Sequence, residues 1–205
     1  MIIVGAKGFA KELLEIAHQL NKTDKLVFFD NLSNDLPSML FGQFPILHNK
    51  QEVLEYFRTV DNQFVLGLGN PLMRRKMCTQ FETWGGEITS LISPYAQVGS
   101  FNTNIEAGTC IMSGSIITND IKIREGVLIN LNCTVGHDSS IGSYSELCPG
   151  VHISGNVIIG ENCFIGTGAV ILPNVELGNN VVVGAGSVVT KNVKDNLTVK
   201  GIPAK

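Results

Sequence analysis

An aliphatic residue recurs at every sixth position through the second half of the chain. Fifteen such positions run without a gap from Ile105 to Val189. A small or β-branched residue stands two places before each of them. Three places after each stands Gly, Asn or Asp, and Tyr144 is the one exception. This period constrains the fold strongly, because no α-helix repeats every six residues and a half-buried strand alternates every two.

The six-residue period predicts short strands that turn a corner after each strand. Asn, Asp and Gly suit these corners because they adopt positive φ at little cost. Three strands close a triangular coil of eighteen residues, so the hexads of 105–194 predict five coils stacked about 4.8 Å apart. A fixed short period of this kind indicates a parallel β-helix. Ile92 and Val98 also fit hexad positions, so we expect the β-helix to start near residue 92.

The first 90 residues follow a different pattern, in which apolar strands alternate with amphipathic helices. This alternation predicts a small parallel sheet of Rossmann type. A chain of 205 residues has room for two small domains, and we expect them at 1–90 and 91–205. The expected strands are 1–4, 26–29, 64–66 and 88–92, and the expected helices are 11–20, 51–58 and 72–84.

Composition excludes several classes of function. The net charge of −3 offers no electrostatic footprint for nucleic acid. No apolar run has the length of a membrane span, and the start of the chain lacks the basic region of a secretory signal, so neither is expected. The cysteines number five, an odd count with no C-x-x-C pair. This usage favours a reducing cytoplasm.

A glycine-rich turn, Gly5-x-x-Gly8, follows the first strand. It is either a tight turn alone or a turn that also places nucleotide phosphates at the N-terminus of the next helix. Asp30 ends the second strand, where an acid can hold a ribose or a base edge. Asn70 and Arg74 follow the third strand, at the same edge of the sheet. Since pockets gather at such edges, we favour nucleotide binding. The domain is too small for the full two-lobed fold of a redox dinucleotide.

His137 lies at a predicted corner of the β-helix, after the inward Val135, and Asp138 follows it directly. A histidine whose second ring nitrogen is held by a carboxylate or a carbonyl can act as a general base. The alternative is a surface histidine beside a turn-forming aspartate. The β-helix has one more histidine, His152, fifteen residues on, which does not stack on His137 in an eighteen-residue coil. We therefore expect no metal site.

Several segments together resemble one family along the whole chain. They are IIVGAKGFAKE at 2–12, LVFFDN at 26–31, GLGNPLMRRK at 67–76, the hexads, NLNCTVGHD at 130–138 and VKGIPAK at 199–205. The chain is similar to the bacterial sugar acyltransferases of the sialic-acid O-acetyltransferase and pilin-glycosylation N-acetyltransferase type. The resemblance implies a left-handed hexapeptide β-helix after the Rossmann-like domain, acetyl-CoA as donor and an amino- or hydroxy-sugar as acceptor. Nucleotide-sugar members bind the nucleotide in the first domain.

The resemblance also implies roles for particular residues. His137 matches the general base and Asp138 its acidic partner, which is often Glu in the family. Asn130 matches a residue that lines the acceptor site, and Gly155 matches a backbone N–H, from the neighbouring subunit, that bonds the acetyl carbonyl. Further matches fall in the nucleotide pocket, at Gly5, Gly8, Asp30 and Asn31, and along CoA, at Thr167, Ala185, Gly201, Ile202 and Pro203.

Three departures concern the acceptor. Phe9 stands where relatives often carry His, Ser93 stands in place of the His of an L-I-H-P segment, and Glu146 stands where a second histidine is common. These differences bear on which sugar is accepted. The matches to the base and to CoA are unaffected by them.

The sequence therefore favours acetyl transfer from acetyl-CoA to the amine of a nucleotide-linked amino sugar. A sialic-acid hydroxyl is the alternative acceptor. A non-enzymatic nucleotide-sugar sensor or scaffold is the alternative class, and the His137–Asp138 pair weighs against it. An acyl-enzyme on Cys133 is disfavoured because the hexad register points that side chain inward. We expect a homotrimer, since an acyl-CoA cleft needs walls from two chains and closed symmetry buries one apolar face of each.

Overall fold

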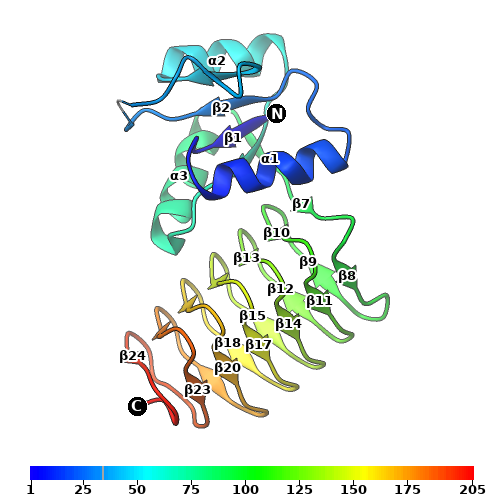
Figure 1. The fold of residues 1–205 in the computed structure, drawn as a ribbon, viewed down its shortest axis with the longest axis vertical. Coiled ribbons are helices and arrows are strands. Elements are labelled where there is room, and N and C mark those ends of the chain that lie inside the picture. Colours follow the sequence, from blue (N-terminus) through cyan, green and yellow to red (C-terminus); the bar gives the residue numbers. More distant parts are fainter. Residues whose placement is uncertain (34) are drawn as a thin grey trace. The chain divides into compact units, whose positions relative to one another are not determined.

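The computed structural model describes residues 1–33 and 35–205 (Figure 1). The chain divides into two compact units. The first consists of Met1–Gly69 and Met73–Leu91, and the second of Asn70–Leu72 and Ile92–Lys205. Each unit has its own sheets. Within the described residues, no helix is long and apolar enough to cross a membrane.

The N-terminal unit holds a six-stranded sheet in the order β3-β4-β2-β1-β5-β6. All neighbouring strands are parallel except β3 and β4, which are antiparallel. The Rossmann-like arrangement of strands and helices is thus confirmed. Its elements are β1 (Ile2–Val4), α1 (Phe9–Gln19), β2 (Val27–Phe29), β3 (Met39–Leu40), β4 (Phe44–Leu47), α2 (Lys50–Thr59), β5 (Gln63–Leu66), α3 (Pro71–Thr83) and β6 (Glu87–Ile88).

Close packing of helices on this sheet explains two features of the sequence. Gly67 follows β5, and a Cβ there would lie only 2.7 Å from the Cβ of Ala10, so α1 packs against bare backbone. On α3, the ring of Phe81 is fully buried and lies 5.1 Å from the ring of Phe29 and 6.2 Å from that of Phe57 on α2. The aromatic side chains therefore hold α2 and α3 together.

The structure differs from the sequence expectations for this unit in two places, one element that was missed and one that was wrong. The antiparallel hairpin of β3 and β4 was not predicted, because Pro45 and the short apolar runs around it do not read as a strand. The single strand expected at 88–92 is two strands in different sheets. β6 pairs with β5 and ends at Ile88, whereas β7 (Leu91–Ile92) is the edge strand of a sheet in the second unit.

The second unit is a parallel β-helix made of three sheets (Figure 1). We call these sheets I, II and III. Sheet I contains β7, β10 (Cys110–Ile111), β13 (Leu128–Ile129), β16 (Glu146–Leu147), β19 (Phe164–Ile165), β22 (Val182–Val183) and β24 (Thr198–Val199). Sheet II contains β8 (Gln97–Val98), β11 (Ile116–Ile117), β14 (Thr134–Val135), β17 (His152–Ile153), β20 (Val170–Ile171) and β23 (Val188–Val189). Sheet III contains β9 (Asn104–Ile105), β12 (Lys122–Ile123), β15 (Ser140–Ile141), β18 (Ile158–Ile159) and β21 (Glu176–Leu177).

The register of these sheets confirms the eighteen-residue coil. Ile117 pairs with Val135, and Ile129 pairs with Leu147. The hexad residues point inward and form one continuous buried core. Fourteen of the fifteen corner residues have positive φ, including Tyr144 at 60°. In the last coil the spacing shortens to sixteen residues, since Val183 pairs with Val199, and there the hexad pattern ends.

Candidate functional site

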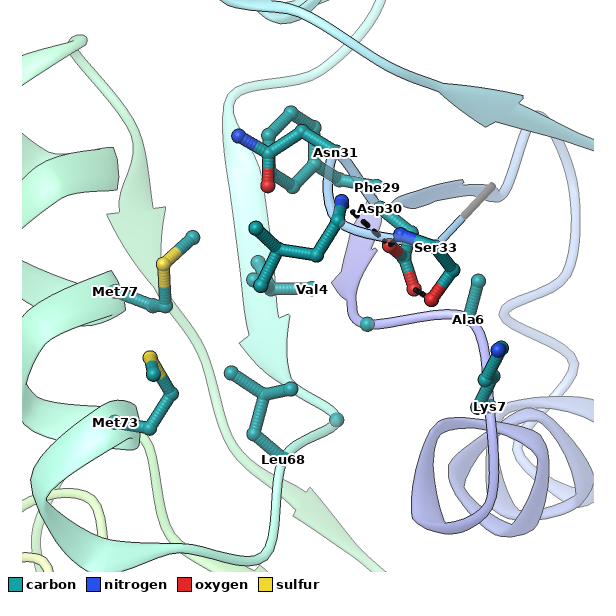
Figure 2. Close-up of a pocket in the computed structure, with 13 residues that line it drawn as sticks. Val4, Ala6, Lys7, Phe29, Asp30, Asn31, Ser33, Leu68, Met73 and Met77 are labelled. Carbon is teal, nitrogen blue, oxygen red and sulfur yellow. Dashed lines mark hydrogen bonds between the residues drawn. The ribbon is translucent and has the colours of Figure 1, made fainter. Parts of the chain in front are cut away.

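A cavity of about 240 Å³ lies where β1, β2 and β5 end in the N-terminal unit (Figure 2). Loops that follow parallel strands meet at this edge, which is where ligands bind in open α/β sheets. The cavity is lined largely by apolar side chains, which suit a planar base. The lining residues are Val4, Gly5, Ala6, Lys7, Phe29, Asp30, Asn31, Leu32, Ser33, Gly67, Leu68, Met73 and Met77.

The two glycines of the turn after β1 serve different purposes. Gly5 has φ +110°, and a Cβ there would lie 2.8 Å from the carbonyl oxygen of Gly67, so the fold itself requires glycine. Gly8 has φ +37° and precedes α1, and a Cβ there would meet only open space. Gly5 lines the cavity, whereas Gly8 is not among the lining residues and is the N-cap residue of α1. A tight turn alone, without a bound nucleotide, therefore accounts fully for the glycine at position 5.

Asp30 and Asn31 also line the cavity, as their predicted roles require. The carboxylate of Asp30 accepts hydrogen bonds from the backbone N–H of Leu32 (3.0 Å) and Ser33 (2.9 Å), and from the Ser33 hydroxyl (3.1 Å). Asp30 thus shapes its own loop (Figure 2). Asn31 is exposed at the cavity.

The residues expected after β5 are placed differently. Asn70 is exposed and does not line this cavity. Arg74 is almost fully buried, and its guanidinium donates a hydrogen bond to the carbonyl oxygen of Gly69. Sequence reasoning missed Met73 and Met77, which lie on α3 across the cavity from Lys7 (Figure 2). Their spacing of four residues on a helix, which places them on one face, was the available signal.

His137 lies at the corner between sheets II and III, two residues after the end of β14. Its side chain is 71% exposed, and its Nδ1 lies 2.7 Å from Oδ2 of Asp138. The rest of the ring lies against Gly155 on the next coil, where an added Cβ would be only 2.6 Å from Nε2. The pair therefore presents Nε2 beside a bare stretch of backbone. The resemblance implied Gly155 from a neighbouring subunit, and in this chain Gly155 also adjoins its own His137.

The other predicted residues of the β-helix lie along a different corner, between sheets I and II. Asn130 is nearly buried there, and its side-chain oxygen accepts a hydrogen bond from the N–H of Leu131 at 2.8 Å. Thr167 and Ala185 are exposed on later coils of the same corner. The tail joins them, since the Gly201 N–H donates to the Ser187 hydroxyl at 3.0 Å, and Ile202 and Pro203 are exposed. Within one chain, a strand of sheet II therefore separates the corner that carries these residues from the corner that carries His137.

The cysteines are placed as inert side chains. All five are free and buried. Burial raises the pKa of the Cys133 thiol to about 11, and it also raises the pKa of Cys163. A buried thiol with a raised pKa is a poor nucleophile near neutral pH.

Comparison with known families gives two matches. Residues 1–81 match the PglD N-terminal domain, and residues 156–191 match the bacterial transferase hexapeptide (six repeats). The two matches fall on the N-terminal unit and on the later coils of the β-helix. They agree with the fold class expected from the sequence, including the left-handed coil of hexapeptide repeats.

Several solved structures are similar along the entire chain. One is a point mutant of the perosamine N-acetyltransferase from Caulobacter crescentus in complex with CoA and GDP-perosamine, at 26% identity, TM-score 0.92, and coverage of 100% of this chain and 94% of that one. The acetyltransferase domain of PglB from Neisseria gonorrhoeae, in complex with acetyl coenzyme A, shows 29% identity, TM-score 0.89, and coverage of 100% and 97%. WeeI from Acinetobacter baumannii shows 28% identity, TM-score 0.88, and coverage of 100% and 99%.

Proposed function

Because the chain belongs to the hexapeptide-repeat sugar acyltransferases with a PglD-type N-terminal domain, we propose that it transfers the acetyl group of acetyl-CoA to the amine of a nucleotide-linked amino sugar. The observation that carries this proposal is the His137–Asp138 pair, with Nε2 presented beside Gly155. The cavity at the ends of β1, β2 and β5 supports it by offering a place for the nucleotide. The similar perosamine enzyme, solved with CoA and GDP-perosamine, supports the same pairing of substrates.

In the proposed reaction the neutral amine of the sugar attacks the thioester carbonyl. A C–N bond forms while His137 Nε2 takes the proton that the amine loses, and Asp138 stabilises the imidazolium through Nδ1–H. The C–S bond then breaks, and the CoA thiolate leaves and is protonated. The products are the amide and free CoA. A backbone donor is needed for the oxyanion of the tetrahedral intermediate. The N–H of Gly155 suits this role, because it donates to no acceptor among the described residues.

Binding is divided between the units in this proposal. Gly5, Gly8, Asp30 and Asn31 hold the nucleotide, Asn70 and Asn130 contact the acceptor, and no metal takes part. The CoA chain runs along the corner of Thr167, Ala185, Gly201, Ile202 and Pro203, where exposed small residues leave room for pantetheine. The protein acts as a homotrimer, and its five buried free thiols favour the cytoplasm.

A thiol-release assay tests the activity. The protein is mixed with acetyl-CoA and a panel of nucleotide-linked amino sugars, and free CoA is measured with a thiol reagent. The buried cysteines keep the background low. We expect release with at least one amino sugar and none with the matching nucleotide-linked hydroxy sugar. Release only with sialic acid would favour O-acetylation, and absence of release with every acceptor would refute an acetyltransferase.

A further inference from the structure

The cavity of the N-terminal unit holds one cationic side chain among its described lining residues, Lys7. Its one carboxylate, on Asp30, already accepts three hydrogen bonds from its own loop. The remaining lining is largely apolar, with Met73 and Met77 facing Lys7 across the cavity (Figure 2). Such a cavity has room for a base on one side and a single positive charge on the other. The diphosphate of a nucleotide sugar carries the opposite charge.

In the structure Lys7 is engaged by another anion. Its Nζ lies 2.5 Å from Oδ1 of Asp35, and the two side chains are 51% and 75% exposed. The Lys7 ammonium lowers the pKa of the Asp35 carboxyl, so Asp35 stays charged. An ion pair exposed to this degree contributes little stability, because water and salt screen it. A phosphate group can therefore replace Asp35 at little cost.

The backbone beside Lys7 favours the same replacement. The N–H groups of Ala6, Lys7, Gly8 and Phe9 donate to no acceptor among the described residues. They precede or open α1, whose N-terminus carries a partial positive charge. Asp35 leaves these donors unused, whereas a phosphate with several oxygens can take the ammonium and backbone donors together.

From this arrangement we propose that Lys7 binds the diphosphate of the nucleotide sugar and that Asp35 holds Lys7 until that ligand displaces it. The proposal rests on the proposed function, because it assigns a residue to the nucleotide site. It makes Asp35 a competitor of the substrate for one ammonium group. Removing Lys7 should therefore weaken binding, and neutralising Asp35 should strengthen it.

Calorimetric titration with nucleoside diphosphates tests the two opposite effects. UDP, GDP, CDP and dTDP are compared first on the wild type, and the tightest is used throughout. Lys7→Gln should raise its Kd about tenfold, the low end for a hydrogen bond to a charged group. Asp35→Asn should lower Kd about two- to fivefold, the scale of an exposed ion pair. In the Lys7→Gln background Asp35→Asn should have no further effect, because Asp35 acts through Lys7.

Lys11→Gln is the matched control. Lys11 lies in the first turn of α1, four residues after Lys7, does not line this cavity, and its substitution should leave Kd unchanged. The inference is overturned if Lys7→Gln binds like the wild type, or if Asp35→Asn tightens binding equally without Lys7. If the wild type binds and acetylates a nucleotide sugar while Lys7→Gln leaves Kd unchanged, this inference is refuted and the proposed function stands. A wild type that binds none of the diphosphates removes the nucleotide site as well.

Discussion

Asp138 combines two duties at a single corner of the β-helix. Its backbone takes the left-handed conformation that the corner requires, with φ of 58°. At equivalent positions of the same corner, side chains bond along the column, as Asn156 does to Asn174 at 2.6 Å. The carboxylate of Asp138 instead turns to His137. The proposed catalytic pair thus uses a residue whose positive φ the corner of the β-helix already requires.

The first prediction concerns the general base. His137→Ala should lower kcat by about 10²–10⁴, the usual scale for loss of a general base, while the KM of acetyl-CoA changes little. Steady-state kinetics with the true acceptor measures both. His152→Ala is the matched control, because His152 is also exposed on the β-helix and its Nδ1 lies 2.9 Å from the Thr134 hydroxyl, with no carboxylate hydrogen-bonded to its ring among the described residues. If His137→Ala kept wild-type turnover, proton removal by this residue would be ruled out.

The ring of His137 explains why position 155 is a glycine. Its equivalents one, two and three coils away carry side chains, as at Phe101, Asn119 and Pro173. Its φ lies outside the left-handed region, so the backbone does not demand glycine. The demand comes from the His137 ring, which occupies the place where a Cβ would stand.

The second prediction follows from this contact. Gly155→Ala keeps the backbone N–H but displaces the imidazole of His137. A displacement of about 1 Å should lower kcat by up to about 100-fold. Combined with His137→Ala, the same substitution should cost little more, because there is no ring left to move. Measuring kcat for the wild type, the two single variants and the double variant gives the coupling between Gly155 and His137. Equal losses in both backgrounds would mean that Gly155 acts without His137.

At the level of elements, the corners of the β-helix add side-chain hydrogen bonds between successive coils. Asn162, Asn180 and Asn196 form a ladder along the corner between sheets III and I, with amide contacts of 3.3 and 3.0 Å. Each has positive φ between 54° and 62°. Asparagine serves both needs, since it tolerates this backbone and its amide bonds to the next coil.

The third prediction separates these two contributions. Asn180→Gly loses the ladder but keeps the backbone conformation, whereas Asn180→Ala loses both. Alanine should therefore be less stable than glycine by about 1–2 kcal/mol, the cost of a side chain in the left-handed region. Urea denaturation of the two variants measures the difference. Equal stability of the two would show that φ at this corner is not what selects asparagine.

The sequence predicted the β-helix well because a pattern of six consecutive residues specifies each strand and the corner after it. An inward aliphatic residue and a corner residue recur in every hexad, and even Tyr144 takes the expected conformation. The β3–β4 hairpin lacks such a pattern and was missed. Adjacency made the His137–Asp138 pair predictable. The Lys7–Asp35 ion pair joins residues that are 28 positions apart in the sequence. The hydrogen bonds that the Asp30 carboxylate accepts depend on how the backbone of residues 30–33 folds. Neither contact could therefore be predicted from the sequence.

At the level of the whole molecule, the predicted site is incomplete in one chain. His137 and Gly155 lie on the corner between sheets II and III, and Thr167 and Ala185 on the corner between sheets I and II. Each sheet also exposes a large aliphatic side chain on its outer surface, namely Val182, Ile116 and Ile158 on sheets I, II and III. Closed threefold symmetry would cover apolar surface and bring the two kinds of corner together.

The fourth prediction is the mass of the assembly. Three chains of 22.1 kDa give a homotrimer of about 66 kDa. Light scattering under native conditions measures this mass directly. A value near that of one chain would exclude a site shared between neighbours.

The last prediction tests the sharing itself. In a trimer whose sites take His137 from one chain and the Ala185 corner from the next, two inactive variants should complement each other. His137→Ala lacks the base, and Ala185→Trp fills the exposed corner proposed for CoA. When the two are unfolded together and refolded as an equal mixture, about a quarter of the sites receive both intact corners, so about a quarter of wild-type activity should return. Refolding each variant alone gives the control. A mixture as inactive as its components would place the base and the CoA corner of every site on the same chain.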